Sequence, residues 1–172
     1  MSTGRIAEEA GSYQILEALA KTAESYLCVG VQEGECLMHV LKGNPDIKRI
    51  ALCDTWGPHH GGTNRGNHEH IAQKLKNTRT NAKITWLDGP SQDLIPTLKE
   101  TFDLTYVDGD HAEEPAYTDL KNVWPLTVKA MVVHDTFFPT VTKALARFVQ
   151  EHPCDVEFYT GGTGSAIVRR KA

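Results

Sequence analysis

Short apolar runs alternate with segments of helical periodicity along most of the chain. Short runs bounded by polar residues are typical of buried strands, and apolar spacings of three and four residues are typical of amphipathic helices. The pattern predicts strands over Tyr26–Val31, Ile50–Cys53, Lys83–Leu87, Phe102–Val107 and Met131–His134. It predicts helices over Ala7–Glu24, Cys36–Leu41, Asn67–Asn77, Gln92–Thr101, Ala112–Val123 and Thr140–His152. Ser91 is a plausible N-cap, and Pro139 suits the first turn of a helix.

The alternation of strands and helices predicts a parallel sheet with helices on both faces. The end of the chain differs, because Gly161-Gly162-Thr163-Gly164 separates two strand-like runs, Asp155–Tyr159 and Ser165–Val168. This pattern predicts a glycine-turned antiparallel hairpin. We therefore expect an α/β fold with a mostly parallel seven-stranded sheet. Its 172 residues suit one domain, residues 1–172, in which an N-terminal helix (residues 1–25) covers the site and residues 26–172 form the core.

The composition is that of an ordinary globular protein, with 40 % hydrophobic and 23 % charged residues. A net charge of −4 argues against a nucleic-acid partner, although Arg169, Arg170 and Lys171 form a local basic run, which we interpret as a solvated chain end. We expect neither a signal peptide nor a membrane span. The cysteines form no CxxC pair, so we interpret them as buried reduced thiols of a cytoplasmic protein: Cys28, Cys36, Cys53 and Cys154.

Acidic residues stand at the ends of four predicted strands: Asp54, Asp88, Asp108 and Asp135. In an open α/β sheet, ligands bind beyond the carboxyl ends of the strands. Carboxylates gathered at one edge repel each other and need a ligand or a cation to stabilise them. The sequence therefore predicts a binding site at this edge of the sheet.

The first strand leads into a glycine turn, Gly30 to Gly34. Its G-x-x-x-G pattern lacks the G-x-G-x-x-G of dinucleotide-binding proteins and is consistent with a ligand or with a simple turn. Asp54 follows about 20 residues later, where an acid can accept both hydroxyls of a ribose. Such an acid suits NAD or S-adenosylmethionine (SAM), or it acts only as a loop or cap residue.

Three motifs resemble known methyltransferases. The segment Leu87–Leu98, with Ser-Gln-Asp-Leu-Ile-Pro, resembles the G-A-S-Q-D-L-I-P-x-L stretch of catechol O-methyltransferases. The Asp-Gly-Asp-His of Tyr106–His111 and the His-Asp of Val132–Asp135 resemble motifs of the macrocin-type O-methyltransferases. The resemblance covers about Tyr26 to Val168 and implies the Rossmann-like fold of class I SAM-dependent methyltransferases.

The resemblance also implies roles for individual residues. Gly30 and Gly34 would lie beside the methionine part of SAM, Asp54 at the ribose, and Ser91 and Gln92 at the adenine. Asp108 would lie by the sulfonium, and Asp88, which ends the third strand, completes the expected cofactor site. The metal-dependent members imply Mg²⁺ or another divalent cation on three residues: Asp108, His134 and Asp135. His111 lies near the position of a catalytic lysine, so it and Asp108 are the catalytic candidates.

Two departures from the family pattern leave alternatives open. Cys28 stands where the superfamily often carries an acid, and His134 replaces an aspartate of the catechol enzymes. Histidine is a poorer Mg²⁺ ligand than a carboxylate, so metal-dependent and metal-free reactions both remain open. His111 is either a base or a structural partner of a neighbouring acid.

The expected activity is methylation of a hydroxyl on a small molecule or sugar. The first alternative is an inactive SAM-binding or interaction module, which Cys28 keeps open. A nicotinamide oxidoreductase is disfavoured, because the chain lacks the glycine fingerprint of that class. A metallohydrolase of the His-Asp type is also disfavoured, because it would carry that dipeptide on a helix, whereas here the dipeptide ends a predicted strand. With no lid domain, either the acceptor is bulky or a homo-oligomer closes the pocket.

Four histidines in or near the loop Thr55–Gly66 lack zinc-ligand spacing, and we interpret them as exposed or substrate-facing: His59, His60, His68 and His70.

Overall fold

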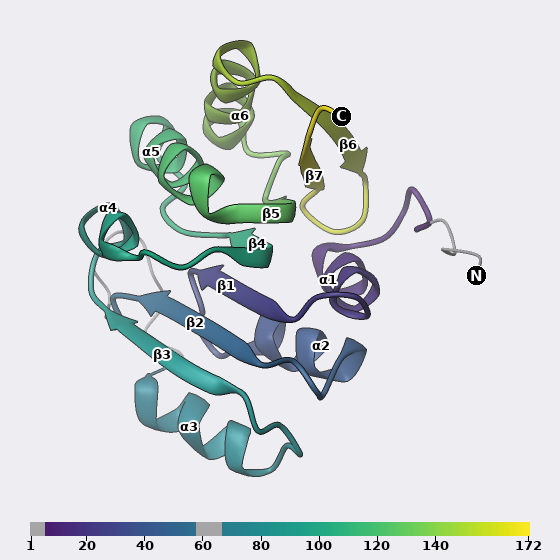
Figure 1. Ribbon diagram of the computed structural model, residues 1–172. Coiled ribbons are helices and arrows are strands. Elements are labelled where there is room, and N and C mark those ends of the chain that lie inside the picture. Colours follow the sequence, from purple (N-terminus) through teal and green to yellow (C-terminus); the bar gives the residue numbers. More distant parts are fainter. Residues whose placement is uncertain (1–5, 58–66) are drawn as a thin grey trace.

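The computed structural model describes residues 6–57 and 67–172, which form one seven-stranded sheet with helices packed on it (Figure 1). The strands are β1 (Ser25–Val29), β2 (Arg49–Asp54), β3 (Lys83–Asp88), β4 (Phe102–Val107), β5 (Thr127–His134), β6 (Cys154–Tyr159) and β7 (Ser165–Arg170). The helices are α1 (Ser12–Ala20), α2 (Glu35–Gly43), α3 (His68–Lys76), α4 (Ser91–Leu94), α5 (Glu113–Val123) and α6 (Pro139–Glu151). Two short 3₁₀ helices, η2 (Ile95–Thr97) and η3 (Trp124–Leu126), follow α4 and α5.

The strand order is β3-β2-β1-β4-β5-β7-β6, and all neighbours from β3 to β5 are parallel. Strand β7 runs antiparallel to both β5 and β6. The predicted mostly parallel sheet with a C-terminal hairpin is therefore confirmed. The order reverses between β1 and β4, and such a switch point is where open α/β sheets bind ligands.

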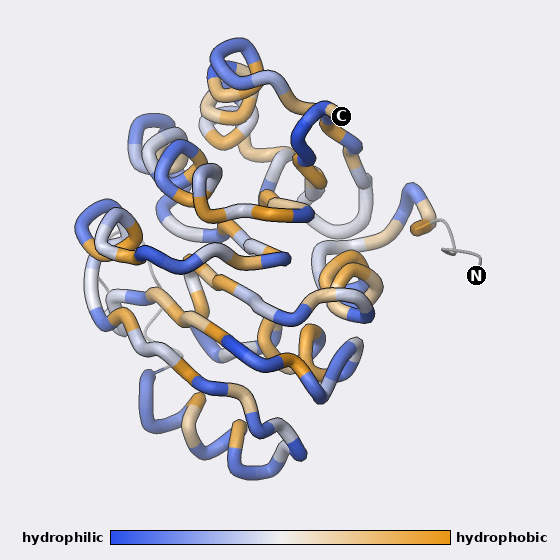
Figure 2. Tube along the Cα trace, viewed as in Figure 1, coloured by the Kyte–Doolittle hydropathy of each residue, from blue (hydrophilic) through white to orange (hydrophobic). Residues whose placement is uncertain are grey.

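Both faces of the central strands are buried. Tyr26 and Cys28 of β1 point into a core formed with α1, α2 and α3, whereas Leu27 and Val29 point into a second core formed with α5 and α6. Alternate residues of a strand point to opposite faces, so a strand covered on both sides is apolar throughout. Figure 2 shows this as hydrophobic colour along the central strands and on the helix sides that face them.

Two predicted helices are longer than the observed ones. The first begins at Ser12 rather than Ala7, because Gly11 is its N-cap and donates its backbone N–H to Oε1 of Gln14 at 2.6 Å. The predicted helix Gln92–Thr101 is reduced to α4 and η2. Pro96 has no N–H to donate, and its ring clashes with a carbonyl one turn earlier, so an α-helix cannot continue through it. Ser91 is the first residue of α4 rather than its N-cap, which is Pro90.

Two smaller interpretations had different outcomes. All four cysteines are buried free thiols, as predicted, although the Sγ atoms of Cys28 and Cys36 lie 3.2 Å apart. The basic run is not simply a solvated chain end. Arg170 lies in β7, stacks 4.4 Å over the ring of Trp124 and donates to the backbone carbonyl oxygen of Trp124.

None of the helices in residues 6–57 and 67–172 is long and apolar enough to cross a bilayer.

The first strand ends at Val29, earlier than predicted, because the backbone turns sharply at Gly30 with φ of +83°. A Cβ atom at Gly30 would lie 1.9 Å from the carbonyl oxygen of Asp108. Only glycine therefore allows the turn after β1 to pass directly beside the turn after β4.

We predict that Gly30→Ala destabilises the protein more than Gly162→Ala, which is a matched control. Both positions have positive φ, but a Cβ at Gly162 meets nothing within 4 Å. Backbone strain costs about 1–2 kcal/mol at either site, and overpacking against Asp108 adds about 1–3 kcal/mol at Gly30 alone. Urea unfolding of both variants measures the difference, and equal losses would show that the contact with Asp108 does not constrain the turn.

Candidate functional site

Four titratable side chains meet at the carboxyl ends of β4 and β5: Asp108, His111, His134 and Asp135. The Nε2 atom of His111 lies 2.8 Å from Oδ2 of Asp135 and 3.7 Å from Oδ1 of Asp108. The Nδ1 atom of His134 lies 3.1 Å from Oδ1 of Asp108 and 3.4 Å from Oδ1 of Asp135. The expected clustering of acids and histidines at this edge is thus present around two of the four strand-end aspartates.

The C-terminal hairpin holds Asp135 in place. Asp135 has φ of +56°, a left-handed conformation that is uncommon for a residue with a side chain. The next two N–H groups, of Thr136 and Phe137, donate to the carbonyls of Gly164 and Thr163 in the hairpin turn. The Thr163 hydroxyl also donates to the Asp135 carboxylate. These hydrogen bonds with the hairpin therefore hold Asp135 in a strained backbone conformation, and such strain is common at functional sites.

Positive charge stabilises this pair of carboxylates. The carboxylates of Asp108 and Asp135 together raise the pKa of His111 to about 10, so the ring is an imidazolium at neutral pH. Burial opposes ionisation of Asp135, but donors from His111 and Thr163 lower its pKa overall. The pKa of His134 is also raised, because its contact with Asp108 outweighs the effect of burial.

A group of three side chains at this edge could hold a metal ion. Ligand atoms of Asp108, His111 and Asp135 all lie within 4.8 Å of one another. The expected set of Asp108, His134 and Asp135 lies at the same place, because Nδ1 of His134 is 3.1 Å from Asp108 and 3.4 Å from Asp135, so both sets stay predictions. Two carboxylates and one imidazole fit a divalent cation, and the imidazole widens the choice beyond Mg²⁺ to Mn²⁺, Fe²⁺ and Zn²⁺.

Asp54 lies at the end of β2, as predicted, but its contacts are with the backbone. Its Oδ2 accepts from the N–H groups of Val31 and Gln32 at 2.8 Å each, and its Oδ1 accepts from the N–H of Trp56 at 2.8 Å. Asp54 therefore fastens the glycine turn to β2. A carboxylate offers about four lone-pair sites, so capacity remains for a ribose hydroxyl.

Asp88 joins an aromatic group at the end of β3. It accepts from Nε1 of Trp56 at 2.8 Å and lies 3.1 Å from Nδ1 of His68. The ring of His68 stacks on Trp86 with centroids 3.6 Å apart. His68 is thus engaged in a specific contact that its place in a polar segment did not reveal. His59 and His60 lie outside the described residues.

Ser91 and Gln92, the expected adenine contacts, both donate to Oδ1 of Asp119 on α5, at 2.6 and 3.3 Å. Asp119 was not a candidate, because an acid within a helix that also carries Lys121 and Asn122 is usually solvated. Its burial, at 0 % exposure, distinguishes it. Tyr106 is a second missed residue, since its hydroxyl donates to Oδ2 of Asp108 at 3.2 Å.

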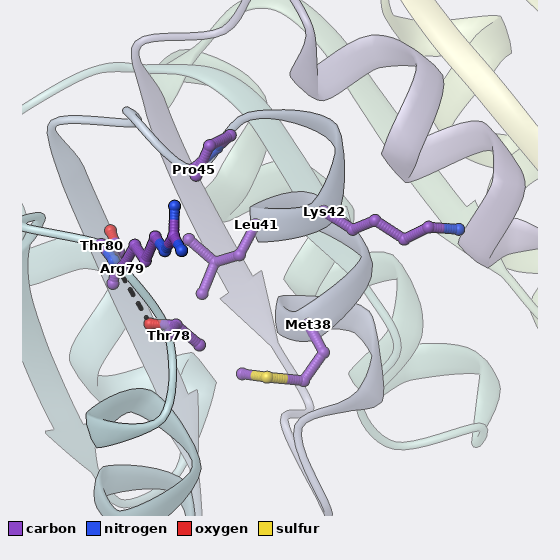
Figure 3. Close-up of a pocket in the computed structure, with 7 residues that line it drawn as sticks. All are labelled: Met38, Leu41, Lys42, Pro45, Thr78, Arg79 and Thr80. Atoms are coloured by element: carbon purple, nitrogen blue, oxygen red, sulfur yellow. Dashed lines mark hydrogen bonds between the residues drawn. The ribbon is translucent and has the colours of Figure 1, made fainter.

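A cavity lies away from these strand-end residues (Figure 3). Its volume is about 250 Å³, and it lies between the end of α2 and the segment before β3, lined by Met38, Leu41, Lys42, Pro45, Thr78, Arg79 and Thr80. The ends of α2 and α3 are at the edge of the sheet where β2 and β3 begin, opposite the aspartates. This cavity is therefore not part of the candidate site.

Comparisons with known proteins bear on the family and the fold of this chain. Residues 27–136 match the family described as "Methyltransferase domain". No curated protein matches the sequence. The fold is similar to that of the O-methyltransferase NovP, with a TM-score of 0.75 and 15 % identity over 93 % of this chain and 79 % of that one.

Two further solved structures have the same fold. The O-methyltransferase TomG from Streptomyces achromogenes, determined with SAM, has a TM-score of 0.70 and 16 % identity over 93 % of this chain and 79 % of that one. The methyltransferase PaMTH1 from Podospora anserina, determined with S-adenosylhomocysteine (SAH), has a TM-score of 0.72 and 15 % identity over 93 % of this chain and 78 % of that one. The family match spans more than half of this chain, which therefore belongs to the methyltransferase domain family and has the Rossmann-like fold of class I SAM-dependent methyltransferases, as its sequence predicted.

Proposed function

We propose that this chain transfers the methyl group of SAM to a hydroxyl on a small molecule or sugar. The observation that carries the proposal is the group of Asp108, His111 and Asp135 beside the glycine turn. Methyl transfer to oxygen requires a cofactor site and a means of removing the hydroxyl proton at the same place. The fold shared with NovP and TomG, both named as O-methyltransferases, supports this reading.

The cofactor site in this proposal runs along the carboxyl ends of β1 to β4. The methionine part lies at the turn between Gly30 and Gly34, and the ribose lies at Asp54. The adenine lies near Asp88, Ser91 and Gln92, and the sulfonium lies by Asp108. A cationic sulfonium beside a carboxylate is electrostatically favourable. Structures of TomG with SAM and of PaMTH1 with SAH support the choice of cofactor.

The reaction is an in-line displacement at the methyl carbon, so positioning supplies much of its rate. The acceptor hydroxyl must also lose its proton. A divalent cation bound between Asp108 and Asp135 would supply positive charge that lowers the pKa of the hydroxyl and of His111. With the cation on the sequence-predicted set of Asp108, His134 and Asp135, His111 would be free to accept the hydroxyl proton at Nε2. With the cation on Asp108, His111 and Asp135, Nε2 would be a ligand, and the activated hydroxyl would give its proton to solvent. Without such a charge His111 is already protonated and only steadies the two carboxylates.

An inactive SAM-binding module is the second candidate, and one observation favours it. Cys28 is buried, with Sγ 3.6 Å from the carbonyl oxygen of Gly30, so it cannot replace the acid that often meets the methionine amino group. The intact group around His111 favours catalysis instead.

We also propose that residues 1–172 form one domain whose N-terminal helix borders the site. Burial raises the pKa of Tyr13 on α1 to about 12, and the nearby Cys36 and then Asp108 add to the shift, which supports that placement.

SAM should raise the melting temperature of the protein, and NADH should not. At about 100 times Kd, binding contributes about 2.7 kcal/mol, which is roughly 5–10 °C for a chain of this size. Asp54→Ala should reduce the shift, whereas the exposed Asp155→Ala should not. Differential scanning fluorimetry measures all four cases. No shift with millimolar SAM would remove SAM as the ligand.

The stability of the metal-free protein should depend on pH through His111. Its pKa is raised from about 6.5 to about 10 on folding, so the folded state binds the extra proton between these values. The stabilisation is fully present below about pH 6.5 and is lost as the pH rises through about 10. In EDTA, the difference in unfolding free energy between wild type and His111→Gln should therefore shrink from about pH 6 to about pH 10. A constant difference would show that His111 is not held as an imidazolium.

Titration with Mn²⁺ should separate the two ligand sets. If the ligands are Asp108, His111 and Asp135, His111→Ala should weaken Mn²⁺ binding at least tenfold, and His134→Ala should weaken it less. Electron paramagnetic resonance of free Mn²⁺ measures both affinities. A larger effect of His134→Ala would restore the set expected from the sequence, and no binding by wild type would favour a metal-free reaction.

A further inference from the structure

Asp119 is a carboxyl group buried below the candidate cofactor site. It lies in the middle of α5 and has 0 % exposure. Its Oδ1 accepts from the Ser91 hydroxyl at 2.6 Å and from Nε2 of Gln92 at 3.3 Å. Both donors belong to α4, which follows the edge strand β3. Asp119 thus ties the beginning of α4 to α5.

The other oxygen of Asp119 lies against the turn that follows β4. A Cβ atom at Gly109 would lie 2.6 Å from Oδ2 of Asp119. Gly109 directly follows Asp108, and its φ is not positive, so the close approach of Asp119 is what requires glycine there. One carboxyl group therefore contacts both the start of α4, which lies at the adenine in the proposed function, and the turn after β4, which lies at the sulfonium.

This arrangement is a poor way to stabilise a fold. Oδ2 of Asp119 is buried without a hydrogen-bond partner in the part of the chain that the structure describes. Burial raises the pKa of Asp119 to about 6, although the Ser91 hydroxyl opposes the shift and the charge of Asp110 adds to it. An apolar side chain of similar volume often serves a core better than a buried charge. The contribution of Asp119 must therefore be sought in what it holds.

Asp119 fixes the orientation of the Gln92 amide. An ionised carboxylate only accepts hydrogen bonds, so the amide must present its NH₂ group to Asp119. Its carbonyl oxygen Oε1 then remains to accept a hydrogen bond from a ligand. The exocyclic amine of adenine is such a donor, whereas hypoxanthine carries a carbonyl at that position. Gln92 is only partly buried, so a ligand can reach it.

We propose that Asp119 is a positioning residue that makes the cofactor site selective for adenine by holding Ser91 and Gln92. This inference rests on the proposed function and adds to it the origin of base selectivity. It assigns no contact between Asp119 and the cofactor. Asp119 acts through the side chains of α4 and through the packing of Gly109.

The test compares the binding of SAH and of S-inosylhomocysteine, which differ at the exocyclic group, by isothermal titration calorimetry of the full chain. Wild type should bind SAH at least tenfold more tightly. Asp119→Leu removes the acceptor, so SAH affinity should fall about tenfold and the preference for SAH should shrink to about twofold. Asp119→Asn keeps an acceptor oxygen and should retain most of the preference. Thr105→Val removes a buried hydroxyl that pairs with Thr127 at 2.9 Å, away from α4, and should leave the preference intact.

The outcomes separate the two proposals. If wild type binds neither compound, the proposed function and this inference both fail. If wild type prefers SAH and Asp119→Leu keeps that affinity and preference, only the role of Asp119 fails. Urea unfolding of each variant adds the second readout, because a merely structural Asp119 would lower stability without changing the ratio of the two affinities. Should Asp119→Leu not fold, Asp119→Ala removes the same acceptor and leaves only a cavity.

Discussion

The repulsion between two carboxylates at neighbouring strand ends is the constraint on which the rest of the site depends. Asp108 and Asp135 are brought together by the parallel pairing of β4 and β5 and are held by His111. The C-terminal hairpin supports Asp135 in a strained backbone conformation. The antiparallel end of the sheet is therefore part of the site as well as part of the fold. A site of this charge is well suited to a cation, whether a metal ion, an imidazolium or a sulfonium.

The glycine turn and Asp54 show how closely the fold and the proposed cofactor site are connected. Gly30 lets the turn after β1 approach the backbone of Asp108, and Asp54 fastens that turn to β2. Three strand ends are therefore locked together before any ligand binds. Pre-organisation of this kind lowers the entropic cost of binding, because little of the site must be ordered by the ligand.

Much of this could be predicted from the sequence, because apolar runs and their terminal acids reflect burial and the polarity of strand ends. The five parallel strands, the hairpin and the edge carrying the aspartates were all predictable. The helix after β3 was predicted too long, because its apolar period continues past Pro96. The sequence predicts His134 as a metal ligand and His111 as a base. Both rings lie within 3.7 Å of Asp108, so the choice between them depends on tertiary packing that leaves no sequence signal. Asp119 was missed because burial of a single helical acid depends on tertiary packing.

The proposed function requires the strand-end aspartates to form a SAM site beside the group that activates the acceptor hydroxyl. A crystal structure of the protein with SAH would locate that site. We expect the ribose hydroxyls at Asp54, the adenine beside Gln92 and the sulfur beside Asp108, with Asp135 and His111 facing the open side of the sulfur. A nucleoside bound elsewhere, or a sulfur remote from Asp108, would contradict the proposed function.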